Sequence, residues 1–319
     1  MSINRHYKDY AEFLAERFDG KVQKLTVDAG FTCPNRDGTL GRGGCIYCNN
    51  RSFSPVEARG DDIERQLEKA KRFFSRKYPQ MRYLAYFQSY TNTYGESVNH
   101  LENLYRRALA VDGVIGLIIG TRPDCMPDEL LERLAEINRS SRVIIEYGAE
   151  TSHDSTLRAI NRCHDSACTA DAVRRTKAAG LDTGLHFILG LPGETEAMML
   201  ETVDFINSLP VDTVKFHQLQ VIKGTRLAAD IAAGRISYTP PTVDEYADLC
   251  AKIVRRLRHD IAIERFVSQS PSELLIAPRW GLKNYQFTAI LNKRLDAEFL
   301  HKICSRDMPK RPPGSVGMY

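Results

Sequence analysis

The sequence predicts an α/β protein built as a partial (βα)6 barrel of the TIM type. Three observations lead to this class: β-rich apolar segments recur, helix-patterned segments lie between them, and most of the strands are near-continuous apolar runs. Such runs are typical of parallel strands with both faces covered. About six units in roughly 220 residues fit a partial barrel better than a complete one. An open doubly wound sheet is the alternative.

The order of the elements follows from the hydrophobic periodicity. Strands are expected at 22–27, 83–87, 114–119, 143–147, 183–189 and 211–219, with a weaker candidate at 261–266. Apolar residues at helical spacing predict helices over 63–74, 101–109, 130–137, 168–179 and 194–208. Pro127 stands at the start of the third helix and Gly180 follows the fourth, as helix-terminal residues do.

The pattern divides the chain into three parts. Residues 1–240 are expected to form the barrel core, and the character of the sequence changes after Pro240 and Pro241. Thr242 and Glu245 form a capping box ahead of a helix with one apolar face. Residues 241–303 are therefore predicted to be a small C-terminal α/β extension that packs on the barrel. Residues 304–319 are predicted to be a proline-rich tail.

Composition is that of an ordinary globular protein. The 319 residues are 43% hydrophobic and 26% charged, and the net charge of +4 neither requires nor excludes a polyanionic partner. No apolar run approaches the roughly 20 residues that cross a bilayer. The N-terminus also lacks the apolar core of a signal peptide. A cytoplasmic protein without a membrane partner is expected.

Three of the eight cysteines, Cys33, Cys45 and Cys48, crowd into a loop over 28–50 that follows the first strand. In a βα barrel, active sites assemble where strands end. Five glycines between 28 and 48 let the backbone wrap closely around a compact object. Because cytosolic thiols stay reduced, a disulfide framework is not expected. Three thiolates on such a loop form a half-cage that suits a [4Fe–4S] cluster with one iron left open.

Two other interpretations of the loop stay open. Structural zinc needs four ligands, and a fourth would come from His6, His100 or a distant cysteine. Three cysteines brought together by chance is the second interpretation, although glycine-rich loops are surface features. Elsewhere, Cys163 and Cys168 flank a histidine at a spacing that suggests an auxiliary metal site, whereas scattered cysteines are mostly small core residues.

The cysteine loop resembles that of the radical SAM superfamily, where a strand leads into three cysteines ending in Cys-x-aromatic-Cys. The common spacing there is C-x3-C-x2-C, whereas this chain has C-x11-C-x2-C. The Elongator-like and YhcC-like branch is the most similar, because it also lengthens the first gap. The resemblance implies a partial barrel of the radical SAM kind, a [4Fe–4S] cluster on the three cysteines, and S-adenosylmethionine (SAM) as the second cofactor.

The same resemblance implies contacts to SAM from side chains in the loop and after successive strands. Gln88 and Ser89 would meet its amino group. Glu150 would contact its ribose or amino group, and Arg162 would bind its carboxylate through paired hydrogen bonds. The full set of implied contacts is Tyr47, Gln88, Ser89, Glu150, Arg162 and His186. Four of them also have a structural interpretation: Arg162 as a surface salt bridge, Glu150 as a helix cap, Tyr47 as a packed ring and His186 as a core histidine.

The implied activity is reductive cleavage of SAM to a 5′-deoxyadenosyl radical, which abstracts hydrogen from a substrate. An electron donor such as flavodoxin or ferredoxin is then required. By analogy with Elongator-like relatives, tRNA is one candidate substrate, and a small molecule or a protein is the alternative. A non-catalytic, zinc-containing RNA-binding module is a third hypothesis. No side chain is assigned a catalytic role.

Overall fold

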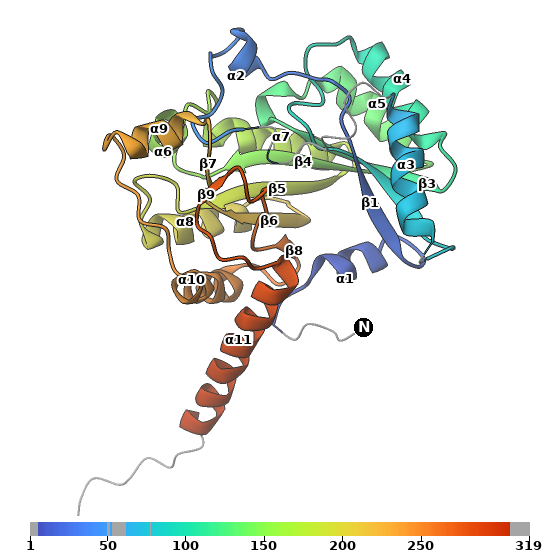
Figure 1. The fold of residues 1–319 in the computed structure, drawn as a ribbon. Helices are drawn as coiled ribbons and strands as arrows, with labels where there is room; N and C mark the ends of the chain where they lie inside the picture. The colour runs from blue at the N-terminus through green and yellow to red at the C-terminus, as the bar shows by residue number, and fades with distance from the viewer. Residues whose placement is uncertain (1–5, 50–51, 53–61, 77, 307–319) are drawn as a thin grey trace, which may run out of the picture.

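A seven-stranded parallel sheet forms the centre of the protein (Figure 1). The computed structural model describes residues 6–49, 52, 62–76 and 78–306. The strands follow one another across the sheet in the order β1-β2-β3-β4-β5-β6-β8, and each neighbouring pair is parallel. Their bounds are β1 (Val22–Val27), β2 (Arg82–Phe87), β3 (Val114–Thr121), β4 (Arg142–Glu150), β5 (Asp182–Leu189), β6 (Thr213–Gln218) and β8 (Ala262–Arg265).

A sheet wound in one direction curls into a partial barrel, so the predicted barrel is confirmed and the doubly wound alternative is wrong. The weak candidate at 261–266 supplies the seventh strand. Its pattern is weak because β8 has only four residues, two of them charged, yet Ala262 pairs with Thr213 of β6. A separate small sheet joins β7 (Val221–Ile222) to β9 (Leu275–Ala277) in antiparallel fashion.

Amphipathic helices cover the outer face of the sheet and share one large apolar core with it. They are α3 (Ile63–Ser75), α4 (Val98–Leu109), α5 (Asp128–Asn138), α7 (Ser166–Ala178), α8 (Glu196–Asn207) and α10 (Val243–Arg256). The expected capping box at Thr242 and Glu245 is present, and α10 buries Tyr246, Leu249 and Ile253. Shorter elements are α1 (Tyr10–Ala15), α2 (Pro34–Asp37), the 3-10 turn η3 (Pro123–Cys125), α6 (Asp154–Ala159) and α9 (Arg226–Ala232).

The last helix, α11 (Asn284–Arg306), begins against the core, where it buries Phe287, Leu291 and Leu295, and then extends away from the body of the protein (Figure 1). The predicted tail 304–319 therefore starts inside this helix, while residues 307–319 lie outside the described residues, as does residue 50 of the predicted cysteine loop. The predicted extension over 241–303 contributes α10, β8, β9 and most of α11. Its boundaries as a domain stay a prediction.

The interior of the barrel is closed at the amino ends of the strands. Phe13 of α1 is buried against Leu84, Ile118 and Ile144, which point inward from β2, β3 and β4. A bidentate ion pair from Arg17, with Nε and Nη2 2.9 and 3.0 Å from the Asp182 carboxylate, holds the end of α1 to the sheet. Access to the interior is therefore from the carboxyl ends of the strands.

Above this apolar layer, four charged side chains form a closed ring. Lys24 of β1 lies 3.2 Å from Glu146 of β4 and 2.6 Å from Glu264 of β8. Lys215 of β6 lies 2.9 Å from each of the same two carboxylates. Burial by itself would raise the pKa of Glu146, but Lys215 and Lys24 outweigh it and hold that pKa well below its usual range. The ring is the polar floor on which the site is built.

Candidate active site

A cavity of about 420 Å³ lies above the charged ring, at the carboxyl ends of the strands. Eight of the nine residues singled out from the sequence line it: Cys33, Cys45, Tyr47, Cys48, Gln88, Glu150, Arg162 and His186. Ser89 is fully buried and does not line this cavity. Barrel active sites occupy the same position, since loops after several strands converge there.

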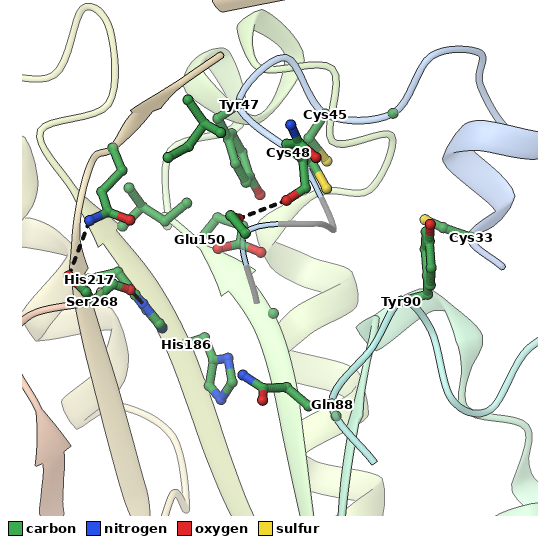
Figure 2. Close-up of a pocket in the computed structure, with 18 of the residues that line it drawn as sticks. Cys33, Cys45, Tyr47, Cys48, Gln88, Tyr90, Glu150, His186, His217 and Ser268 are labelled. Atoms are coloured by element: carbon green, nitrogen blue, oxygen red, sulfur yellow. Dashed lines mark hydrogen bonds between the residues drawn. The ribbon is translucent and has the colours of Figure 1, made fainter. Parts of the chain in front are cut away.

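The three cysteines of the loop converge on one side of the cavity. Figure 2 shows Cys45 and Cys48 close together and Cys33 apart from them, and all three line the cavity. Cys33 is the N-cap residue of the short helix α2, and its side chain makes no capping hydrogen bond. A turn with a hydrogen bond from Cys48 N to Cys45 O (3.0 Å) positions the other two cysteines. Burial, followed by repulsion from Cys45, raises the pKa of the Cys48 thiol to about 11. Three such thiols become thiolates together only when a cation compensates their charge.

Hydrogen-bond donors surround these sulfurs. Asn35 Nδ2 lies 3.5 Å and Arg162 Nη1 lies 3.6 Å from Cys45 Sγ, while Arg36 Nη2 donates to the Cys48 carbonyl at 3.0 Å. A side chain at Gly41 would place its Cβ 2.1 Å from Asn35 Oδ1, so only glycine leaves room for this donor. Donors of this kind tune iron–sulfur clusters, and the donor set fits a cluster with three thiolate ligands.

A single metal ion fits less well. In the part of the chain that the structure describes, no group of three His, Cys, Asp or Glu side chains is arranged to hold one ion. A cube of four irons and four sulfides holds its thiolates further apart than one ion does. Cys163 and Cys168 accordingly have no third metal-ligating partner among the described residues, and the Cys163 thiol instead lies 3.1 Å from Asn35 Oδ1.

Glu150 and Arg162 meet at the side of the cavity. Arg162 Nη2 lies 3.4 Å from Glu150 Oε1 and also donates to the Gly148 carbonyl, and both side chains are largely buried. A Cβ on Gly148 would stand 2.7 Å from Arg162 Nη2 and 2.8 Å from Glu150 Oε1. The absence of a side chain at Gly148 thus makes room for the pair. Nε of Arg162 is buried without a protein hydrogen-bond partner among the described residues.

Backbone strain concentrates around the same site. Among the described residues, those other than glycine with positive φ are Tyr90, Glu150, Asn161 and Cys163. Tyr90 and Glu150 line the cavity, and Asn161 Nδ2 donates to the carbonyl of Gly44 in the cysteine loop at 2.9 Å. Each such conformation costs about 1–3 kcal/mol and persists where the surroundings enforce it, as at functional sites.

The remaining predicted residues point into the cavity at different depths (Figure 2). His186 lies above the ring, with Nε2 2.8 Å from Glu146 Oε2. Burial and then Lys215 lower the pKa of His186, which keeps its ring neutral at pH 7. Tyr47 lies beside the cysteines, and burial, then Cys45, raises its pKa well above its usual range. Gln88 follows β2 and reaches the cavity that Ser89 does not.

Several side chains of the site received no role from the sequence. Asn35, which contacts Cys45, and Arg36, which lines the cavity, follow Cys33 after Pro34. His217, Arg265 and Ser268 line the cavity near the ends of β6 and β8. Charged residues inside otherwise apolar strands were the available signal for the last group. The loop pair carries no signal, because its contacts depend on how residues 34–44 fold back.

Comparisons with known proteins agree with this geometry. The model of the radical SAM superfamily matches residues 33–206, and that of the Radical_SAM C-terminal domain matches 211–297. Protein YhcC of Escherichia coli (strain K12) is 38% identical over 281 residues, covering 88% of this chain and 89% of that protein. A tRNA uridine(34) acetyltransferase of Dehalococcoides mccartyi is 26% identical over 173 residues, covering 53% of this chain and 36% of that protein.

Among solved structures, the archaeal Methanocaldococcus infernus Elp3 with an N-terminal deletion superposes with a TM-score of 0.65. It is 16% identical, and the match covers 89% of this chain and 64% of that chain. This likeness concerns the fold, which is the curled parallel sheet described above.

A partial barrel whose mouth carries a C-x11-C-x2-C loop defines a radical SAM enzyme, and the chain belongs to the radical SAM superfamily. Within that superfamily it is a YhcC-like protein. The family's cofactors are a [4Fe–4S] cluster and SAM, which agrees with the expectation from the sequence. A non-catalytic zinc module is therefore wrong. Among the described residues, no helix combines the length and apolarity needed to span a bilayer.

Proposed function

We propose that Cys33, Cys45 and Cys48 hold the [4Fe–4S] cluster, and that the enzyme cleaves SAM reductively to abstract hydrogen from a substrate. The observation that supports this assignment is the convergence of the three thiols, with N–H donors around them, on one cavity that also contains Glu150 and Arg162. Bound together, cluster and SAM supply a 5′-deoxyadenosyl radical, at the cost of one electron from a flavodoxin or ferredoxin.

The chain's own residues then bind and orient SAM. Arg162, whose guanidinium faces the cavity beside Glu150, binds the SAM carboxylate. Glu150 accepts a hydrogen bond from the amino group or ribose, and Gln88 is the second contact to the amino group. Tyr47 packs against the adenine, and His186 lies below, on the path to the substrate. Because SAM chemistry at a cluster needs reduced thiols, we also assign the enzyme to the cytoplasm.

We further propose that the substrate is RNA, in particular tRNA. Tyrosine rings line the cavity together with amide and charged side chains, among them Tyr47, Tyr90 and Gln88. Aromatic faces beside hydrogen-bonding groups suit a nucleoside base, which stacks and is read by its polar edge. The similarity to a protein named as a tRNA uridine(34) acetyltransferase supports the same substrate class. A polar small molecule or a peptide group is the alternative.

Electron paramagnetic resonance tests the cluster assignment. Protein purified without oxygen and reconstituted with iron and sulfide is reduced with dithionite and measured with and without SAM. Single Cys33→Ala, Cys45→Ala and Cys48→Ala variants should lose the [4Fe–4S] signal and the SAM-induced shift. Cys163→Ala, beside the site, and Cys250→Ala, buried in α10, are matched controls that should retain both. A signal that survives in all three loop variants would show that other residues hold the cluster.

The substrate class has a separate test. Bulk tRNA from a strain that lacks this gene is incubated with enzyme, reductant and SAM, and 5′-deoxyadenosine is quantified. If tRNA is the substrate, its addition accelerates 5′-deoxyadenosine release, prior ribonuclease digestion abolishes the effect, and nucleoside mass spectrometry finds a changed base. Acceleration by a small-molecule extract, but not by tRNA, would favour the alternative.

A further inference from the structure

One cation in the barrel interior has no acidic partner. The ring of Lys24, Lys215, Glu146 and Glu264 pairs two positive with two negative charges. Arg265, the last residue of β8, adds a third positive charge and lines the cavity. Among the described residues, no carboxylate lies within ion-pair distance of its guanidinium. The interior therefore carries one uncompensated positive charge beneath the site.

The guanidinium of Arg265 is also short of hydrogen-bond acceptors. Its bond from Nη2 goes to Nδ1 of His217, at 3.2 Å, and its Nε is buried without a protein partner in the described part of the chain. A half-buried guanidinium with free donors on a cavity wall needs an acceptor, because unsatisfied charged donors are costly. A planar, anionic oxygen pair satisfies such a fork best.

The neighbouring groups are arranged to favour the same ligand. His217 Nδ1 accepts from Arg265 and lies 2.7 Å from Ser268 Oγ, so the ring proton is on Nε2 and that nitrogen is a donor. Burial, then Arg265 and His186, hold the pKa of His217 well below its usual range, so the ring is a neutral donor and does not compete with Arg265 for an anion. Ser268 is itself fixed, since Gln218 donates to its carbonyl and accepts from its N–H.

We propose that Arg265, with His217 and Ser268, forms a subsite for an anionic group of the substrate, a carboxylate or a phosphate ester. The inference rests on the proposed function, because it describes the substrate of the same cavity. It narrows that substrate to a molecule, or a modified nucleoside, that brings a negatively charged oxyacid group to the wall formed by β6 and β8.

SAM has a carboxylate of its own, but the structure offers it a different arginine. Arg162 lies by Glu150 and donates toward Cys45, next to the cysteine loop. Arg265 belongs to β8 and contacts His217 of β6. Arg36 also lines the cavity, and it is held to the Cys48 carbonyl. Arg122 lines the cavity as well, and it is paired with Asp124 at 2.7 Å. Arg265 is thus the cavity arginine left for a group other than the cluster and SAM.

Ligand-observed NMR on the reconstituted, SAM-saturated enzyme tests the subsite. The probes are ¹³C-labelled acetate and methyl phosphate, whose line widths report binding, and their two arms distinguish a carboxylate from a phosphate. Arg265→Gln should weaken the better probe by about 10–100-fold, as expected for losing charged hydrogen bonds. Ser268→Ala, which retains the charge, should weaken it less. Arg279→Gln, exposed on the same segment, is the matched control and should bind as wild type does.

The outcomes separate the two levels of the proposal. Iron content and the SAM-induced resonance shift are recorded for every variant, so loss of folding is recognised independently, and Ser268→Ala then carries the test. Probes that bind wild type no better than Arg265→Gln overturn the subsite, while an intact SAM response leaves the proposed function standing. Probes that bind the SAM-free enzyme and are displaced by SAM, together with weaker SAM binding by Arg265→Gln, would also overturn it, because Arg265 would then hold the SAM carboxylate.

Discussion

Replacing Glu146 by glutamine tests whether the charged ring determines the stability of the barrel. The carboxylate of Glu146 is only 2% exposed and serves four donors. Lys24 and Lys215 approach it at 3.2 and 2.9 Å, and His186 and Tyr86 at 2.8 and 2.7 Å. Glu146→Gln keeps the volume but removes the charge, and it directs an amide NH2 at one of these donors.

The expected cost follows from the burial. Removing one member of a buried ion pair leaves its partners uncompensated and costs about 3–5 kcal/mol. That loss is a large part of the 5–15 kcal/mol that holds a typical domain folded. An exposed pair provides the contrast: Glu196 lies 2.6 Å from Lys252, and both side chains are about half exposed. Glu196→Gln should cost no more than about 1 kcal/mol.

Urea unfolding at pH 7 measures both variants. The single tryptophan, Trp280, packs on Tyr246 and Phe287, so its fluorescence reports the fold, and circular dichroism provides a second probe. Since the pKa of Glu146 is depressed in the folded state, its contribution is present above the unfolded pKa and is lost as pH falls through the folded one. A Glu146→Gln protein within 1 kcal/mol of wild type at pH 7 would refute the reasoning.

Three further substitutions probe the site. Gly148→Ala places a Cβ 2.7 Å from Arg162 Nη2 and so displaces this guanidinium. The affinity for SAM, measured by calorimetry, should fall about tenfold while the iron content stays the same. An unchanged affinity would show that the added methyl group does not disturb Arg162. Arg162→Lys keeps the charge but loses the fork, so SAM should bind at least about tenfold more weakly, whereas a surface salt bridge would tolerate the change. Burial, then Arg162, lowers the pKa of His164 to about 3. As pH falls below about 6.5, the unfolded chain therefore binds a proton at His164 before the folded chain does, which favours unfolding. Between pH 7 and 5, the free energy of unfolding of wild type should fall by about 1–2 kcal/mol more than that of His164→Asn, as measured by thermal unfolding. Equal decreases in the two proteins would contradict this reasoning.

The sequence predicted the barrel and the cysteine loop because both depend on local patterns. The six strong apolar runs became strands within a few residues of the expected bounds, since strands covered on both faces are apolar at most positions. The strand at 261–266 was weak because its inward residue, Glu264, is charged. Its partner Lys24 lies 240 positions away, and such pairing has no local signature.

The contacts within the site were less accessible from sequence. Ser89 and Gln88 are adjacent, and only the fold of the turn after β2 decides that Gln88 lines the cavity while Ser89 is buried. Asn35 reaches Cys45 because the loop folds back at Gly41, where a side chain would collide with Asn35. This steric requirement for glycine is visible only in the three-dimensional structure. Arg265 stands out only after the neighbouring carboxylates have been assigned to other cations, in the ring and in the Arg122–Asp124 and Arg162–Glu150 pairs. Sequence patterns reveal the periodicity of apolar residues. The roles of Gln88, Asn35 and Arg265 depend instead on contacts with residues that are distant in the sequence.

The charged ring also substitutes for the backbone bonds that an incomplete barrel lacks. β1 and β8 are the two edges of the sheet, and no ladder joins them. Lys24 on one edge and Glu264 on the other meet at 2.6 Å, and both are linked through Glu146 and Lys215 on the wall between them. Side-chain ion pairs therefore connect the two edge strands of the open barrel. Homologous proteins should consequently change the four ring positions together, since replacing one residue alone would break the ion pairs between the edge strands.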